Sequence, residues 1–308
     1  MASKPTPEGR SGEPMSSETM TSYRDVWYQS GDGLRLHARD YTRADGAATL
    51  LCLHGLTRNA ADFEGLCAHL HRQYPMVVAE QRGRGQSAWD PNPGNYNPAT
   101  YVQDMFLLMA ELGLERPVLV GTSMGGLMAM VMNALRPGAF AGVILNDIGP
   151  EVNPAGLDRI KGYVGKGAPV ATWQEAVAQV RAINQDAFPH YGEDHWQRFA
   201  RRLYAEDEAG VPRLLYDPAI AQPMAESDAS AVPADLWPVF AQLDRVPLLL
   251  IRGELSDILS TDTVAEMRRR KPDLRYLEVP GVGHAPMLDE PEAVAAIRAF
   301  LATLEPNR

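Results

Sequence analysis

Residues 118–128 read Val-Leu-Val-Gly-Thr-Ser-Met-Gly-Gly-Leu-Met, and they predict a strand, a tight turn and a helix around Ser123. The short apolar run Val118–Val120 is typical of a buried strand, and apolar residues recur at helical spacing after the serine. Such a turn has no room for side chains two positions before and after the serine, which accounts for Gly121 and Gly125. The hydroxyl is therefore expected at the carboxyl end of the strand, beside a helix N-terminus that favours developing negative charge.

This pattern is weak evidence on its own, since three fixed positions in five recur easily in a chain of 308 residues with 26 glycines. A glycine-rich turn holding a structural serine would look the same. The rest of the chain favours a functional serine, because further apolar runs typical of buried strands alternate with helical segments. Those runs lie at residues 48–53, 76–79, 141–145, 246–251 and 274–279. Strand and helix in this order predict a parallel sheet with right-handed crossovers.

The alternation is preceded by a predicted hairpin over Asp25–Tyr41, with its turn at Gly31–Gly33. It is interrupted between about Gly149 and Pro238, where no clean strand is evident and the expected helices are short and polar. We interpret this interruption as a helical insertion over the carboxyl edge of the sheet. Most of its aromatic residues are expected to form its own small core, with a minority shaping a pocket. They are Tyr163, Trp173, Phe188, Tyr191, Trp196, Phe199, Tyr204 and Tyr216.

Composition is that of an ordinary globular protein, with 45% hydrophobic and 22% charged residues. The formal net charge is −10, and the one basic cluster, Arg268–Lys271, falls at an expected helix end. Nucleic acid is therefore not an expected partner. No apolar run approaches the length of a membrane span, so a membrane is not an expected partner either.

The two cysteines, Cys52 and Cys67, lie in apolar segments and indicate buried thiols rather than a disulfide framework. Residues 1–22 are rich in Ser, Pro, Glu and Thr and lack an apolar core. They predict a disordered tail without a secretory signal, and the expected location is cytoplasmic.

Polar residues of distinct catalytic kinds follow four of the expected strands, namely His54-Gly55, Ser123, Asp257 and His284. In an open parallel sheet the carboxyl ends of the strands meet at one crevice, where ligands bind. A serine becomes a strong nucleophile when a histidine takes its proton and a carboxylate orients that histidine. We therefore predict that Ser123 is the nucleophile, His284 the base and Asp257 the acid.

Two backbone N–H groups are expected to hold the oxyanion of the reaction intermediate. One is that of Met124, at the helix start behind the serine, and the other is that of Leu56, after His54-Gly55. Each donor of this kind is typically worth about 3 to 4 kcal/mol. The chemistry calls for no metal and no organic cofactor.

These motifs resemble those of α/β-hydrolase fold enzymes, in particular bacterial carboxylesterases, lactonases and meta-cleavage-product hydrolases. The resemblance spans about Tyr23 to Leu304 and rests on His54-Gly55, Arg82–Ser87, the serine turn, Gly253–Asp257 and Gly283-His284. It implies an α/β-hydrolase fold, with a mostly parallel eight-stranded sheet flanked by helices and a helical cap insertion. The implied core domain comprises residues 23–148 and 239–308, and the implied cap comprises residues 149–238.

Two positions depart from the commoner family pattern. Glu80 stands where many members carry an aspartate before the Arg-Gly pair, which is expected to affect only the loop. Asp147 ends the strand after the serine turn, where some members place the acid, and it is an alternative to Asp257. Asp257 is favoured because its Gly-x-x-x-Asp turn matches the commoner pattern. Without a catalytic role, Asp147 would be an N-cap or turn residue.

We predict that the chain, as a monomer or homodimer, cleaves a carboxylic ester of a small molecule through an acyl-enzyme. The same triad could instead open a lactone or break the carbon–carbon bond of a dienol diketone. In the last case Arg58 would hold a substrate carboxylate; otherwise Arg58 is a surface residue. A hydrolase-fold ligand-binding protein or receptor is the alternative from another class.

Overall fold

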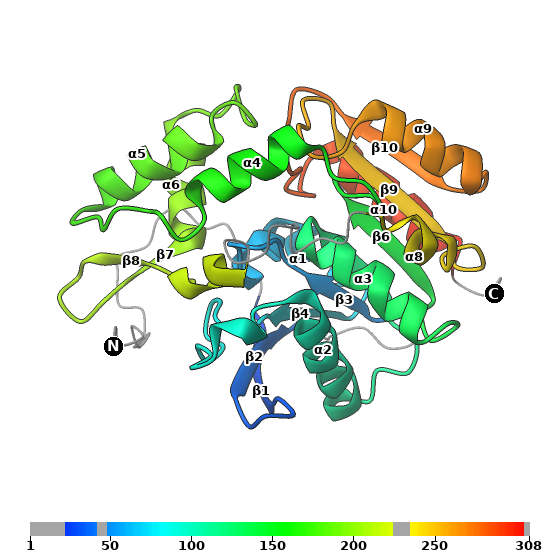
Figure 1. The fold of residues 1–308 in the computed structure, drawn as a ribbon, viewed down its shortest axis with the longest axis horizontal. Helices are drawn as coiled ribbons and strands as arrows, with labels where there is room; N and C mark the ends of the chain where they lie inside the picture. The colour runs from blue at the N-terminus through cyan, green and yellow to red at the C-terminus, as the bar shows by residue number, and fades with distance from the viewer. Residues whose placement is uncertain (1–21, 42–47, 224–234, 305–308) are drawn as a thin grey trace.

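The computed structural model describes residues 22–41, 48–223 and 235–304, and its centre is one eight-stranded sheet (Figure 1). The strand order is β1-β2-β4-β3-β5-β6-β9-β10. The strands are β1 (Arg24–Gln29), β2 (Arg35–Asp40), β3 (Leu50–Leu53), β4 (Met76–Glu80), β5 (Val118–Thr122), β6 (Gly142–Asn146), β9 (Leu248–Gly253) and β10 (Arg275–Val279). β2 runs antiparallel to β1 and β4, and the remaining neighbours are parallel. The predicted mostly parallel, eight-stranded sheet and the N-terminal hairpin are confirmed.

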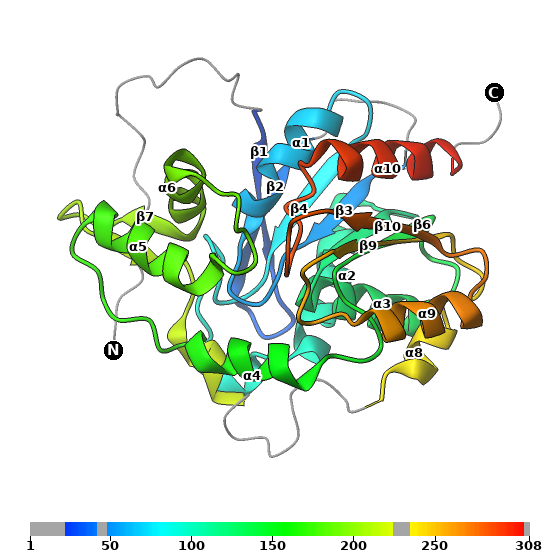
Figure 2. The ribbon, with the colours of Figure 1, turned by 90° about the horizontal axis from the view of Figure 1, so that it is seen from above.

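Helices cover both faces of the sheet, as the continuous apolar strands require (Figure 2). Alternate residues of one strand face opposite layers, so Leu51 and Leu53 join one core cluster while Leu50 and Cys52 join the other. The first layer contains α2 (Pro98–Leu112), α3 (Met124–Leu135), α8 (Trp237–Ala241) and α9 (Thr261–Arg270), and the second contains α1 (Glu64–Leu70) and α10 (Pro291–Ala302). None of the helices in the described ranges is long and apolar enough to cross a lipid bilayer.

Residues 153–223, between β6 and β9, form a separate layer beyond the carboxyl ends of the strands (Figures 1 and 2). We call this segment the insertion. It contains α4 (Pro154–Tyr163), α5 (Trp173–Asn184), α6 (Glu193–Leu203), β7 (Tyr204–Glu206), β8 (Pro212–Leu214) and the 3-10 turn η3 (Pro218–Ala221). The expectation that it holds no strand is wrong, because β7 and β8 pair as a two-stranded antiparallel sheet. Strands of three residues are too short to show a periodic pattern in the sequence.

Backbone hydrogen bonds tie the insertion to the core at several places, one of which is from Asn153 N–H to Ile258 O at 2.9 Å. Leu215 O accepts from Gly85 N–H and Gly83 O accepts from Asp217 N–H, both at 2.8 Å. On the other side, Ala187 O accepts from Gly283 N–H at 2.6 Å, next to His284. The insertion is therefore attached both to the loop after β4 and to the loop that carries the predicted base.

The loop after β4 turns tightly around the buried carboxylate of Glu80. Gly85 has φ +51°, and a Cβ there would lie 2.1 Å from the carboxylate. Glu80 accepts hydrogen bonds from the N–H groups of Gln86 at 2.6 Å and Ala60 at 3.2 Å, and it pairs with His37 Nδ1 at 2.8 Å. Glu80, which departs from the family pattern, thus stabilises this loop and the start of the 3-10 turn η1 (Ala60–Phe63).

Glu80 gives the fold a specific dependence on pH. Burial would raise the pKa of Glu80, but the hydrogen bond from His37 and the charges of His37 and Arg39 lower it to about 2. An unfolded glutamate titrates near pH ~4.3, so this stabilisation is fully present above that pH and is lost as the pH falls towards 2. We expect Glu80→Gln to lower the free energy of unfolding by about 3 kcal/mol at pH 7 and by progressively less towards pH 3, in urea titrations. If the difference in free energy of unfolding between wild type and Glu80→Gln stayed constant from pH 7 to pH 3, Glu80 would not have the lowered pKa.

Candidate active site

Ser123 lies in the turn between β5 and α3, as predicted. Its backbone has φ +52° and ψ −117°, a conformation that costs a non-glycine residue about 1 to 3 kcal/mol. A Cβ on Gly121 would lie 2.3 Å from Gly125 O, and one on Gly125 would lie 2.0 Å from Leu53 O. Both glycines are therefore required by backbone contacts, and the strained turn holds the serine hydroxyl at the strand end.

The side chains of Ser123, His284 and Asp147 form a continuous hydrogen-bonded relay. Ser123 Oγ lies 2.9 Å from His284 Nε2, and His284 Nδ1 lies 2.7 Å from Asp147 Oδ2. Because a carboxylate only accepts hydrogen bonds, this assigns the proton to Nδ1 and leaves Nε2 to accept from the serine. The Asp147 side chain is fully buried and that of His284 is 9% exposed, so the relay faces the pocket only at its serine end.

Asp147 is fixed by donors from the loop after β9. Gly253 N–H donates to Oδ1 at 2.9 Å, and Ser256 Oγ donates to Oδ2 at 2.7 Å. Asp147 itself has φ +57° and follows β6 directly, so its side chain turns towards the end of the neighbouring strand. Sequence reasoning missed Ser256, because nothing in the turn distinguishes it from its neighbours.

Asp257, the predicted acid, does not contact His284. Its carboxylate pairs instead with Arg159 of α4, with Nε–Oδ2 at 2.5 Å and Nη2–Oδ1 at 2.9 Å. Burial would raise the pKa of Asp257, but Arg159 and the nearby His284 lower it below its ordinary value. The preference for Asp257 over Asp147 is thus corrected by the geometry, because Ser256 occupies the side of the turn that faces the histidine.

The loop after β3 is shaped by His54, which is fully buried and is not part of the relay. Its Nδ1–H donates to Gly55 O at 2.7 Å, and its Nε2 accepts from Gln81 N–H at 3.1 Å. Burial lowers the pKa of His54 to about 4, so the ring is neutral near pH 7. In a trans peptide the C=O and N–H point to opposite sides, so holding Gly55 O fixes the direction of Leu56 N–H.

Arg84 fixes the backbone carbonyl of Leu56. It is fully buried, and its Nε donates to Leu56 O at 2.9 Å. Its Nη1 donates to Arg82 O and to the Tyr101 hydroxyl, both at 2.8 Å. The Arg84 guanidinium also lies 4.0 Å from Met124 Sδ. This buried arginine therefore touches both residues predicted to supply oxyanion donors.

The N–H groups of Leu56 and Met124 donate no hydrogen bond to any acceptor among the residues that the structure describes. Met124 is the first residue of α3, where a helix leaves its N–H groups unpaired. Gly55 lies close to the serine, since a Cβ added there would be 3.8 Å from Ser123 Cβ. These positions suit the predicted donors.

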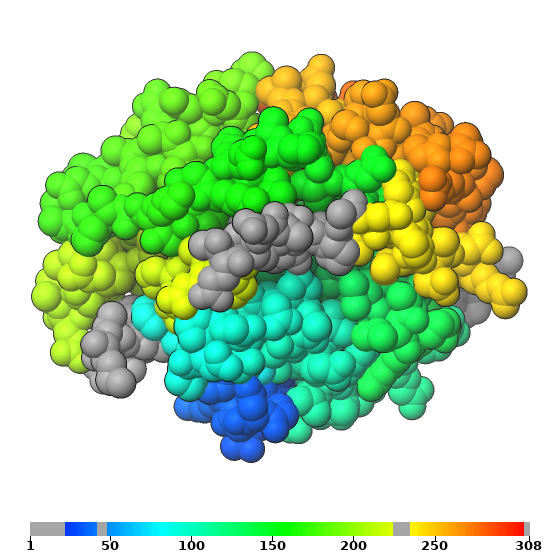
Figure 3. Space-filling model, viewed as in Figure 1, coloured from blue at the N-terminus to red at the C-terminus, as the bar shows by residue number. Residues whose placement is uncertain are grey.

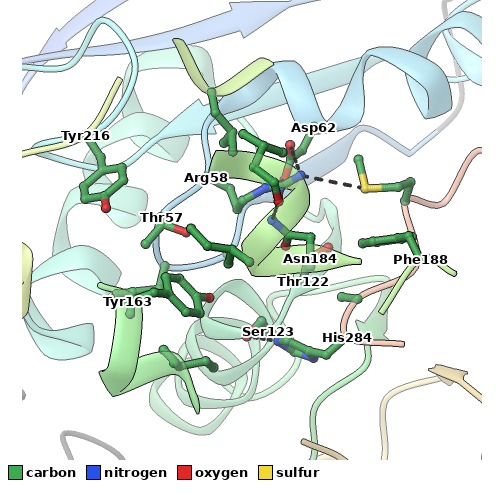
Figure 4. Close-up of a pocket in the computed structure, with 18 of the residues that line it drawn as sticks. Thr57, Arg58, Asp62, Thr122, Ser123, Tyr163, Asn184, Phe188, Tyr216 and His284 are labelled. Atoms are coloured by element: carbon green, nitrogen blue, oxygen red, sulfur yellow. Dashed lines mark hydrogen bonds and ion pairs between the residues drawn. The ribbon is translucent and has the colours of Figure 1, made fainter. Parts of the chain in front are cut away.

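A pocket that is partly open to solvent lies over Ser123 and His284 between the sheet and the insertion (Figure 4). Its lining includes polar side chains such as Thr57, Asn184 and Tyr163 as well as apolar ones such as Phe188. Four of the eight insertion aromatics line it, more than the expected minority: Tyr163, Phe188, Tyr204 and Tyr216. The other four pack in or against the insertion's own core: Trp173, Tyr191, Trp196 and Phe199.

Arg58 is a lining residue of the pocket rather than a surface residue. Its Nε and Nη2 pair with Asp62 at 2.6 and 2.8 Å, and its guanidinium stacks 4.1 Å from the centre of the Phe199 ring. Asp62 also lines the pocket. Within the described part of the chain, no three His, Cys, Asp or Glu side chains are grouped to hold a metal ion.

Comparison with known proteins defines the class. The model of the Alpha/beta hydrolase family matches residues 50–297. A crystal structure of an alpha/beta hydrolase from Novosphingobium aromaticivorans superposes with a TM-score of 0.87 at 42% identity, covering 92% of this chain and 99% of that one. The chain therefore belongs to the alpha/beta hydrolase family, and it is a hydrolase.

Two of the more similar relatives have named activities. The 3-hydroxybutyrate-oligomer hydrolase of Cupriavidus necator is 34% identical over 257 residues, which cover 82% of this chain and 87% of that protein. The 2-(acetamidomethylene)succinate hydrolase of Mesorhizobium japonicum is 28% identical over 235 residues, which cover 76% of this chain and 81% of that protein. This chain is similar to both along most of its length.

Substitution of Asp147 and of Asp257 is expected to affect turnover very differently. Asp147→Asn removes the acceptor that sets the His284 tautomer, and the equivalent change in a serine protease lowers kcat about 10⁴-fold. We expect a loss of this order for Asp147→Asn and a change of less than about tenfold for Asp257→Asn, with an activated ester as substrate. Thermal unfolding of both variants is the control for folding. Equal losses, or a larger loss for Asp257→Asn, would reverse the assignment.

Proposed function

We propose that this protein is a serine hydrolase that cleaves a carboxylic ester through an acyl-enzyme, with Ser123 as nucleophile. The observation that carries the proposal is the relay from Ser123 Oγ through His284 to Asp147, with distances of 2.9 and 2.7 Å, at the floor of the pocket. Serine, histidine and a buried carboxylate in this arrangement perform acyl transfer on several unrelated folds.

In the first half of the reaction, Ser123 Oγ attacks the ester carbonyl carbon while His284 Nε2 takes the hydroxyl proton. The imidazolium formed is stabilised by Asp147, which keeps its negative charge. His284 then gives the proton to the leaving alcohol oxygen, which leaves the acyl group on Ser123. In the second half, water attacks the acyl-enzyme with His284 again as base, and the carboxylic acid is released.

The N–H groups of Leu56 and Met124 serve as the oxyanion donors in this proposal. The His54 and Arg84 contacts that fix the Leu56 peptide are already formed, so the donors need not reorganise when charge develops on the carbonyl oxygen. A neutral His54 is also suited to this place, because it sets the peptide without adding a second charge that titrates in the site.

Short esters of hydroxy acids are the substrates that we favour. The similarity to a 3-hydroxybutyrate-oligomer hydrolase supports this choice. The pocket lining contains both polar side chains, such as Thr57 and Asn184, and apolar ones, such as Ile183, and a mixed lining suits a chain that carries both ester and short alkyl groups.

Ser123→Ala tests the reaction. We expect it to lower turnover of activated and hydroxy-acid esters by roughly 10⁴-fold or more, because no other group supplies the nucleophile. A phosphonate that labels active-site serines should modify wild type at Ser123 and leave the variant unmodified, as read by mass spectrometry. Ser260→Ala, at the N-cap of α9, is the matched control and should keep wild-type turnover. Undiminished turnover by Ser123→Ala would overturn the proposal, and a preference for lactones or dienol diketones would reassign the substrate.

A further inference from the structure

The pocket has two arginines, Arg58 and Arg159, and they differ in where their acidic partners lie. The partner of Arg58 is Asp62, which also lines the pocket, so that pair adds no net charge to the lining. The partner of Arg159 is Asp257, which is not among the lining residues of the described chain. Arg159 therefore presents a positive charge to the pocket, with its counter-charge behind it.

Asp257 holds the Arg159 guanidinium in one orientation. Nε and Nη2 are taken by the two carboxylate oxygens at 2.5 and 2.9 Å. The guanidinium also interacts with the hydroxyl of Tyr163, which lines the pocket. Nη1 donates no hydrogen bond to any carboxylate or carbonyl group among the described residues. A guanidinium fixed on one edge has less side-chain entropy to lose when it binds an anion on another. The Arg159 side chain is 32% exposed, so water and small ligands reach it.

Arg159 lies within the same pocket as the nucleophile. Ile160 and Tyr163, on the same helix α4, line the pocket together with Ser123, and the close-up shows Tyr163 beside Ser123 and His284 (Figure 4). A protonated His284 would also lower the pKa of Asp257, which places the Asp257–Arg159 pair near the relay. In the space-filling view, α4 lies beside the segment that follows β9 (Figure 3). The Arg159–Asp257 ion pair connects these two segments.

Burial raises the pKa of Tyr163, so its hydroxyl stays protonated and available as a second donor beside Arg159. The whole chain carries a formal charge of −10. An anionic ligand is therefore disfavoured over most of the surface, and a local positive charge inside a cleft has a large effect on where it binds.

We propose that Arg159, held by Asp257, binds a free carboxylate of the ester substrate, so that the enzyme prefers anionic esters to neutral ones. This inference rests on the proposed function. It names the substrate class as short esters with a terminal carboxylate, of which a hydroxy-acid dimer is the simplest. It also gives Asp257 a function, which is to position the guanidinium that recognises the substrate.

The test compares two substrates that differ only in charge: the linear dimer of 3-hydroxybutyrate, and the same dimer with its terminal carboxylate replaced by a carboxamide. Both have the same single ester bond. Wild type is expected to cleave the carboxylate form with the higher kcat/KM. Arg159→Gln is expected to lower kcat/KM for the carboxylate form by ten- to a hundredfold, mainly through KM, because a hydrogen bond to a charged group is lost. For the carboxamide form the same variant should stay within about threefold of wild type.

Arg58→Gln is the matched control, since it removes the other pocket arginine and should affect the two substrates alike. Arg159→Lys should recover part of the preference, because it keeps the charge and loses the planar fork. The inference is overturned if Arg159→Gln weakens both substrates equally, if it weakens neither, or if only Arg58→Gln is selective. It is also overturned if wild type cleaves neither dimer while the phosphonate still labels Ser123, a result that leaves the proposed function standing. Loss of labelling at Ser123 would instead refute the proposed function.

Discussion

The hydrogen bond between His284 Nδ1 and Asp147 Oδ2, at 2.7 Å, is the contact on which the arrangement of the site depends. It joins residues 137 positions apart, one after β6 and the other after β10, and these two strands are separated in the sheet only by β9. The end of β9 then supplies Gly253 N–H and the Ser256 hydroxyl to the same carboxylate. With these contacts in place, the base has one orientation relative to Ser123, and a fixed orientation is what general-base catalysis requires.

Asn146, the residue before Asp147, joins the same elements by a second route. Its Nδ2 donates to Thr122 Oγ1 at 3.0 Å and to Pro286 O at 2.8 Å, and its backbone O accepts from Ser123 N–H at 3.0 Å. One buried amide thus connects the turn of Ser123 with the loop of His284. The last residue of β6 and the residue after it therefore fix, between them, the positions of both side chains.

Local features of the fold could be predicted from the sequence, and long-range ones could not. The serine turn follows from Gly121 and Gly125, because the steric constraint lies within five residues, and the alternating apolar runs predict the sheet for the same reason. The choice between Asp147 and Asp257 depends on which carboxylate the ends of β6 and β9 turn towards His284. That direction is set by φ +57° at Asp147 and by Ser256, and neither has a sequence signature. A commoner family pattern was then the only guide, and here it pointed to the wrong aspartate.

Asp147 and Asp257 have different hydrogen-bond partners, and these partners suit the two carboxylates to different roles. An imidazolium that forms on His284 is stabilised by a carboxylate with no competing cation, and Asp147 meets this condition because its other partners are a neutral N–H and a hydroxyl. Two unit charges 4 Å apart at an effective dielectric constant of about 20 interact by about 4 kcal/mol, so an unpaired arginine beside the relay would oppose the protonation of His284. The Asp257 carboxylate, bound to Nε and Nη2 of Arg159, reduces this opposition without taking Nη1. A guanidinium in the same pocket as His284 therefore calls for a second acid, and Asp257, four residues beyond the end of β9, is that acid.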